Sequence, residues 1–523
     1  MAQQKSDSRI VPKGPRKLAS SRGVEPPGGG KATAVKGDDL QLAMSFATAE
    51  SSRTKREAER VNKPNLFGAG THKVPQAEAN SSQQDHARIE KVVQCLREAF
   101  AKVAANKGAP GPDRQTIEDV QQHWPKVAAK LLRTLLDGTY RPGEIRRVWI
   151  PKGDGKVRGL GIPNVVDRVV QEAVRQVLEP VFEPTFHNAS HGFRPGRGCQ
   201  TAISQAVSYV QEGRHWVVDM DLEKFFDRVH HQRLLARLAQ RVDDKRLLVL
   251  IGRMLKAGVV MPDGVKVTTE EGVPQGGPLS PLLSNIVLDE LDWELDRRGH
   301  RFVRYADDSN IYVRSERAGT RVMASVTAFI NKRLRLKVNA SKSAVAQPET
   351  RHFLGYRMAP MPDGSVEILL SERSMKRLRK RIVELVPRSG GRSLEAVILK
   401  INRYLKGWMG HFGVCTQGIE RLMGDTDAHI RRRLRAVVLK HWKRKLTIAR
   451  QLIRLGVRPK TVWRRIYDGR KSTWALSHDY VVDRGLNNAF FAKQGLFSVR
   501  KRFQEIWTEV PVPVKQLSLF GDT

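Results

Sequence analysis

Acidic residues, cysteines and long apolar runs are all scarce in this chain. Its 523 residues include 92 Lys and Arg but only 54 Asp and Glu, which gives a formal net charge of +38. The three cysteines lie far apart, which excludes a disulfide framework. No apolar run reaches the length of a membrane span, and the start of the chain lacks the apolar core of a signal peptide. We expect a soluble protein of a reducing, cytoplasmic compartment with no membrane partner.

The large excess of positive charge predicts the kind of partner. Like charges at this density repel each other unless a polyanion neutralises them, and phosphate backbones are the most common polyanions. A generally basic surface without a specific partner is the plainer interpretation. A net charge of +38 favours nucleic-acid binding over a basic surface without a specific partner.

Composition divides the chain into five stretches. Residues 1–82 are basic and rich in Gly, Pro and Ser, which predicts a disordered tail. Strand and helix patterns are mixed over 83–365 and indicate an α+β domain. Basic amphipathic helices follow over 366–450. Residues 451–508 combine Arg with aromatic residues, and 509–523 is predicted to be a flexible tail.

Four carboxylates follow strand patterns. Asp307 and Asp308 interrupt a predicted β-hairpin, FVRYADDSNIYV, and WVVDMD places Asp219 and Asp221 on one face of a buried strand by period-two alternation. Mg²⁺ binds a few carboxylates and completes its shell with water and phosphate oxygens, and two such ions can drive phosphoryl transfer. An Asp-Asp pair alone is more often a surface turn, so the hypothesis depends on the neighbouring motifs.

Three further segments carry residues suited to a nucleotide. The segment EGVPQGGPLSPLLSNI places Gln275 and two glycines before a helix, where a substrate can approach the backbone closely. The basic hairpin PKGDGKVRGLGIP carries Lys152, Lys156 and Arg158, whose charges suit a triphosphate. NASKS places Lys342 beyond the aspartate hairpin.

These motifs resemble those of reverse transcriptases when they are read in order. The series is LGIP, HGFRPGRG, DLEKFF, GVPQGGPLSPLLSNI, YADD, NASKS and FLGY, over residues 100–360. The preceding NKGAPG and the later YLKGWMGHF and RRRLRAVVLKHWKR resemble bacterial group II intron-encoded proteins. The resemblance implies a right-hand polymerase with fingers and palm over 83–365. An α-helical thumb, or maturase, domain over 366–450 and a small DNA-binding region over 451–508 would follow.

The resemblance also implies a role for individual residues. Asp221, Asp307 and Asp308 match the catalytic aspartates that hold two Mg²⁺ ions, while Asp219 supports the strand. Lys342 matches a lysine that protonates the departing pyrophosphate.

The implied dNTP-binding residues come from three different motifs. Phe226 would lie under the incoming sugar, where its ring would collide with a 2′-hydroxyl and so favour dNTPs over NTPs. Gln275 would contact the nucleotide, and Lys152 and Arg158 would contact its triphosphate.

The implied function is RNA-directed DNA polymerase and splicing maturase of a group II intron. Its partners would be the intron RNA and the target DNA, in a bacterial cytoplasm close to the nucleoid. Residues 451–523 contain no cysteine and one histidine, so we expect no HNH endonuclease. Two alternatives stay open: another bacterial reverse transcriptase, serving defence or diversity generation, and a non-enzymatic RNA-binding splicing factor.

The last residues carry one further motif. Gln516, Leu517, Leu519 and Phe520, in QLSLF, resemble the peptides with which bacterial proteins dock on the replication sliding clamp. A short tail that offers Leu and Phe to a hydrophobic groove is a common form of peptide recognition. The plainer interpretation is an apolar tail packed on its own domain.

Overall fold

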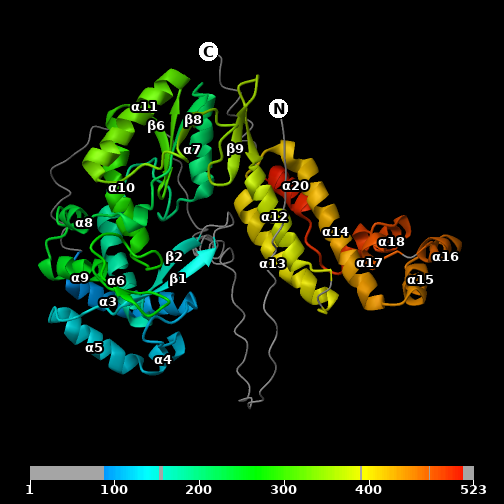
Figure 1. The fold of residues 1–523 in the computed structure, drawn as a ribbon, viewed down its shortest axis with the longest axis horizontal. Helices are drawn as coiled ribbons and strands as arrows, with labels where there is room; N and C mark the ends of the chain where they lie inside the picture. The colour runs from blue at the N-terminus through cyan, green and yellow to red at the C-terminus, as the bar shows by residue number, and fades with distance from the viewer. Residues whose placement is uncertain (1–86, 152–156, 389–390, 470, 510–523) are drawn as a thin grey trace, which may run out of the picture.

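The structure is a computed structural model that describes residues 87–151, 157–388, 391–469 and 471–509. Within these ranges the chain forms two sheets of four strands, one two-stranded ribbon and a long series of helices. Figure 1 shows a mixed body of strands and helices joined to an all-helical extension. The α+β expectation is therefore confirmed. The predicted tail at 1–82 and the predicted tail at 509–523, except Glu509 at the end of the last helix, lie outside the described residues together with the clamp motif.

The first part of the mixed body is a helical layer beside a small sheet. Helix α3 (Ile89–Ala105) packs along α6 (Val165–Phe182), and apolar residues recur at helical spacing in both. Strands β1 (Ile145–Pro151) and β2 (Val157–Ile162) form the predicted hairpin. They continue through β4 (Val259–Val260) to β5 (Lys266–Val267) in the order β2-β1-β4-β5. The other helices here are α4 (Ile117–Gln122), α5 (Trp124–Leu136), α8 (His231–Leu238) and α9 (Lys245–Leu255).

The second sheet carries the aspartates. Its strands run in the order β6 (Arg301–Tyr305), β7 (Asp308–Val313), β3 (Trp216–Met220) and β8 (Ala344–Ala346), all antiparallel. The helices around this sheet are α7 (Cys199–Gln211), α10 (Ser280–Arg297) and α11 (Glu316–Phe329). Every second residue of β3 turns to the opposite face. As a result Val218 and Met220 join the core shared with the fingers helices, whereas Val217 joins a second core.

The helical extension begins after a β-ribbon. Strands β9 (Tyr356–Pro360) and β10 (Val366–Leu370) lead into α12 (Glu372–Leu385), α13 (Leu394–Phe412) and α14 (Glu420–Trp442). Helix α12 buries Met375, Leu378, Ile382 and Leu385, which recur at helical spacing along one face, as expected of the amphipathic helices of this stretch. Trp408 is 3% exposed and its ring centroid lies 4.8 Å from that of Phe412, so both rings pack inside this domain.

The C-terminal helices turn back onto the extension. After α14 the chain turns at Lys443, and α15 (Lys445–Arg454) packs on α16 (Pro459–Tyr467), so the predicted boundary at 450 falls inside a helix. The short helices α17 (Thr473–Leu476), α18 (Tyr480–Gly485) and α19 (Asn488–Lys493) follow. Helix α20 (Val499–Glu509) lies against α13 and α14, as Figure 1 shows. Within the described residues no helix is both apolar enough and long enough to cross a membrane.

Candidate active site

The two adjacent aspartates lie at the tip of the β6–β7 hairpin. Tyr305 pairs with Asp308, so Ala306 and Asp307 form a two-residue turn. Ala306 has a φ of +58°, in the left-handed region that residues with a side chain rarely occupy. Asp307 is half-buried, and solvent reaches part of Asp308 although protein atoms crowd its carboxyl group. The sequence therefore predicted the hairpin, and the structure adds an unusual backbone conformation directly before the carboxylates.

Asp221 lies one residue beyond the end of β3. Its backbone N–H donates to Ser343 Oγ at 3.0 Å, and its carbonyl accepts from the Asn339 N–H at 2.8 Å. The Lys342 ammonium lies 3.0 and 3.2 Å from the two Asp221 carboxylate oxygens. The segment NASKS thus holds Asp221 by its backbone and neutralises its side chain, which brings together two of the predicted site residues.

Asp219 has a different partner. Its Oδ2 accepts from Arg351 Nε at 2.9 Å and from Arg351 Nη2 at 2.5 Å, and the same Nη2 donates to the Lys342 carbonyl at 2.6 Å. Arg351 therefore ties β3 to the segment that carries Lys342. This arrangement agrees with a supporting role for Asp219, and Arg351 is a contributor that the sequence motifs did not reveal.

The carboxylates are close enough to influence one another. Desolvation raises the pKa of Asp308 to about 7, and the negative charges of Asp307, Asp221 and Asp219 add to this rise. Desolvation also raises the pKa of Asp307, with the Arg158 guanidinium acting in the opposite direction. When carboxylates lie close together, the charge of each one opposes the ionisation of the others and raises their pKa values. Such raised pKa values are common at functional sites.

The donor atoms of this site can be compared with those that a divalent cation requires. Carboxylate oxygens whose charges repel each other are donors that suit Mg²⁺, because a cation would relieve that repulsion. Among the described residues, however, no group of three or more His, Cys, Asp and Glu side chains stands ready to hold a metal ion. Asp221 is paired with the Lys342 ammonium instead. The donor chemistry fits a divalent cation, and binding by all three aspartates requires this ion pair to open.

The predicted nucleotide contacts gather around one loop. The Gln275 carbonyl accepts from the Gly161 N–H at 2.7 Å, and the Val273 N–H donates to the Phe226 carbonyl at 2.6 Å. The loop therefore connects the β1–β2 hairpin, which carries Arg158, to the segment after β3. Gly276 has a φ of +124°, and a Cβ there would lie 2.5 Å from the Gly161 carbonyl oxygen, so this approach requires glycine. Lys152 lies outside the described residues.

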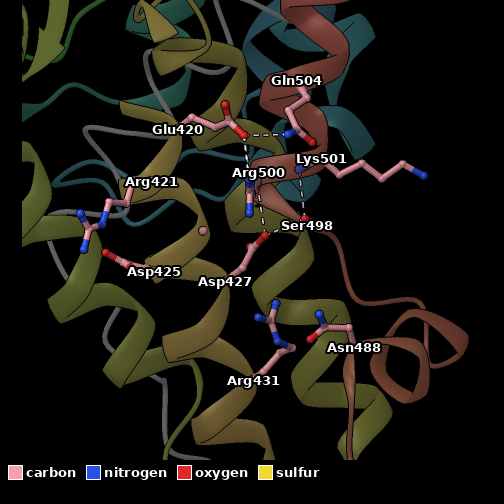
Figure 2. Close-up of a pocket in the computed structure, with 11 residues that line it drawn as sticks. Glu420, Arg421, Asp425, Asp427, Arg431, Asn488, Ser498, Arg500, Lys501 and Gln504 are labelled. Atoms are coloured by element: carbon pink, nitrogen blue, oxygen red, sulfur yellow. Dashed lines mark hydrogen bonds and ion pairs between the residues drawn. The ribbon is translucent and has the colours of Figure 1, made fainter. Parts of the chain in front are cut away.

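A pocket of about 600 Å³ lies far along the chain from the aspartates, between α14 and the start of α20 (Figure 2). Asp427 accepts from the backbone N–H groups of Val499 and Arg500, and Glu420 pairs with Arg500 at 2.9 Å. None of the residues assigned to metal or nucleotide lines it. Its acidic residues hold the first turn of α20 in place, which explains why this helix lies against α14.

Comparison with known families agrees with the two halves of the fold. Residues 150–358 match the family described as reverse transcriptase (RNA-dependent DNA polymerase), and residues 375–454 match the maturase-specific domain of group II introns. The first range contains both four-stranded sheets, apart from the first five residues of β1, and the second contains α13, α14, α15 and all but the first three residues of α12. The chain thus contains a region that matches reverse transcriptases followed by a region that matches the group II intron maturase domain, the combination found in the group II intron-encoded proteins it resembles.

Three curated relatives are similar to parts of this chain. Protein YkfC of Escherichia coli K12 is 38% identical over 210 residues, which cover 39% of this chain and 55% of the relative. The group II intron-encoded protein LtrA of Lactococcus lactis is 29% identical over 355 residues, covering 55% and 58%. The putative COX1/OXI3 intron 2 protein of Saccharomyces cerevisiae is 26% identical over 405 residues, covering 65% and 46%. The chain thus spans about half the length of the relatives it matches.

Proposed function

We propose that this protein is an RNA-directed DNA polymerase that also acts as the splicing maturase of a group II intron. The observation that carries the proposal is the pairing of β3 with β7, which sets Met220 opposite Ser309 and so brings Asp221 beside Asp308, inside a region that matches reverse transcriptases. The matched maturase domain favours an intron protein over a defence or diversity-generating enzyme. A non-enzymatic splicing factor would have no need for a costly concentration of negative charge.

In the proposed reaction, Asp221, Asp307 and Asp308 hold two Mg²⁺ ions, which would supply charge neutralisation for the attacking 3′-hydroxyl and the leaving pyrophosphate. Arg158 and Lys152 bind the triphosphate, Gln275 contacts the nucleotide, and the Phe226 ring excludes a 2′-hydroxyl. Lys342 leaves Asp221 and donates a proton to the departing pyrophosphate. Arg351 keeps the Lys342 backbone beside Asp219 throughout.

Intron RNA and target DNA are the proposed polyanionic partners. The outer face of α12 exposes Arg373, Lys376, Arg379 and Lys380, which suit a phosphate backbone. Farther along, Trp463 and Tyr467 are 38% and 49% exposed, and Lys445 Nζ lies 5.6 Å from the Tyr467 ring centroid. Exposed rings beside cations suit nucleic-acid contacts and support the DNA-binding assignment. A location near the bacterial nucleoid, and docking on the sliding clamp through QLSLF, are predictions that accompany this proposal.

The test is the double variant Asp307→Ala with Asp308→Ala. Metal-assisted charge stabilisation contributes several kcal/mol, which corresponds to at least about a thousandfold loss of cDNA synthesis. Affinity for the intron RNA should change by less than about threefold, because the cations proposed to bind it lie on other elements. Template-dependent dNTP incorporation and filter binding measure the two quantities. Normal polymerisation by the double variant would refute the assignment of the aspartates.

A further inference from the structure

Arg304, on strand β6, is an arginine whose side chain is completely buried. All five of its guanidinium N–H groups have acceptors. Nε and Nη2 donate to the two carboxylate oxygens of Asp292 on α10, at 2.7 and 2.5 Å. The remaining donors bind Asn285 Oδ1 at 3.0 Å, Ser190 Oγ at 2.7 Å and the Ala306 carbonyl at 2.8 Å. Since arginine has five such donors, this network uses its full capacity.

The network ends on the turn that carries the aspartates. Ala306 accepts from Arg304 Nη1 and has the left-handed backbone conformation described above. A Cβ at Gly192 would lie 2.3 Å from the Ala306 nitrogen, so the backbone of Gly192 approaches the turn closely. Asn285 Nδ2 donates to the Gly192 carbonyl at 2.9 Å. The strained residue therefore binds Arg304 and lies close to Gly192, and Asn285 binds both of these residues.

Stability alone does not explain a buried arginine at this position. A buried ion pair loses so much solvation that well-packed apolar residues in its place are often neutral or stabilising. An apolar side chain could not donate to the Ala306 carbonyl or join it to Ser190, Asn285 and Asp292. In addition to packing, Arg304 therefore fixes the conformation of the turn at Ala306.

We propose that Arg304, oriented by Asp292, is a positioning residue that sets where Asp307 and Asp308 lie. It touches neither substrate nor metal and acts through the backbone of Ala306. The inference rests on the proposed polymerase function and adds to it a connection among three motifs. HGFRPGRG supplies Gly192 and directly follows Ser190, GVPQGGPLSPLLSNI supplies Asn285, and the RYADD segment supplies Arg304.

The test is Arg304→Lys in the full chain, which keeps a positive charge beside Asp292 but lacks the guanidinium fork. A single-nucleotide burst on an RNA template with a DNA primer separates two quantities. The burst amplitude gives the fraction of active enzyme, and the burst rate gives the rate of incorporation. Displacement of reacting groups by about 1 Å can cost roughly a hundredfold. We expect the rate to fall about ten- to a hundredfold, with the amplitude and the half-saturating dNTP concentration within about twofold.

Arg433→Lys is the matched control. Arg433, on α14, is also buried and donates to the backbone carbonyls of Val386 and Val383, within the thumb core. Its substitution should leave the burst rate unchanged. A lower amplitude with an unchanged rate for Arg304→Lys would show a purely structural role and overturn the inference. An unchanged rate and amplitude would overturn it as well.

A second variant keeps the inference testable if Arg304→Lys fails to fold. Ser190→Ala removes the single 2.7 Å bond to Arg304 Nη2 and leaves the ion pair with Asp292 intact. We expect it to fold and to lower the burst rate several-fold, and an unchanged rate would overturn the inference. Absence of incorporation by the unaltered chain would overturn the proposed function together with this inference. If the unaltered chain incorporates nucleotides and both variants do so at the same rate, this inference alone is overturned.

Discussion

The ammonium of Lys342 lies 3.0 Å from Oδ2 of Asp221, so the proposed proton donor and a proposed metal ligand neutralise each other. Their side chains are 54% and 24% exposed, which leaves both accessible to a substrate. An ion pair at this position competes with any cation that binds Asp221. The same contact therefore affects two measurable properties, the rate of catalysis and the demand for metal.

Lys342→Ala should change these two properties in opposite directions. Loss of a general acid typically costs 10²- to 10⁴-fold, so we expect the maximal incorporation rate to fall by about a hundredfold. The Mg²⁺ concentration for half-maximal activity should decrease, because the ammonium no longer competes for Asp221. A Mg²⁺ titration at saturating dNTP measures both. Lys337→Ala is the control, since Lys337 is exposed and pairs only with Glu223 among the contacts described. A higher Mg²⁺ requirement in Lys342→Ala would contradict the proposed competition between Lys342 and Mg²⁺ for Asp221.

Phe226→Ala should weaken the choice of sugar. Removing the ring opens space for a 2′-hydroxyl, and discrimination by steric exclusion of one small group is typically about 10- to 200-fold. We expect the ratio of dNTP to NTP incorporation efficiency to fall at least about tenfold. Phe225→Leu is the matched control: Phe225 is 2% exposed in the core and stacks edge-on against Phe226 at 5.2 Å. If Phe225→Leu lowered the ratio of dNTP to NTP incorporation as much as Phe226→Ala does, disturbed packing in this region would explain the effect instead of the loss of the Phe226 ring.

The raised pKa of Asp308 predicts how stability depends on pH without metal. In the folded protein its pKa is about 7, whereas an unfolded Asp titrates near 3.9. Between these values the folded state keeps a proton that the unfolded state has released, so rising pH favours unfolding. The Tm in EDTA should fall as pH rises from 5 to 8, and the slope should be shallower in Asp308→Asn. Added Mg²⁺ should raise the Tm at pH 8 in the unaltered chain. Identical slopes for both proteins would exclude Asp308 as the source.

The QLSLF segment gives a prediction that is independent of the polymerase site. A peptide of the last fifteen residues should capture the bacterial sliding clamp, because Leu519 and Phe520 would enter a hydrophobic groove. Leu519→Ala with Phe520→Ala should abolish capture, while Asp522→Ala serves as a control at the edge of the motif. Persistent capture by the double variant would mean that other residues make the contact.

Local patterns predicted the elements but not the long-range contacts. The helix over Val165–Phe182 and the apolar face of α12 follow from periodicity, which depends only on neighbours in sequence. Arg351 lies 132 positions from Asp219, and no local signal connects them. Likewise, the strand prediction extended to Asp221, but the structure ends β3 at Met220. The backbone of Asp221 bonds to Ser343 and Asn339 instead of a neighbouring strand.

The predicted boundary at 450 shows another limit of local reasoning. The chain turns at Lys443, whose φ is +57°, within the basic run KHWKRK. Glycine or asparagine would have signalled such a turn, whereas lysine gives no warning. The candidate site itself was more predictable than its support. The motifs identified the aspartates and Lys342, while the network around Arg304 became visible only when distant segments were brought together.

The alternation of β3 between two cores has a consequence for shortened forms of the protein. Val217 faces an apolar cluster that includes Leu378, Ile401 and Leu405 of the thumb helices, while Val218 faces the fingers. Helix α7, which belongs to the reverse transcriptase region, packs on this side of the sheet and shares the same cluster with the thumb helices. Cutting the chain after the reverse transcriptase region would therefore expose the apolar residues that α7, β9 and β10 share with the thumb. Such a fragment should aggregate, because a large apolar patch in water is a site of association.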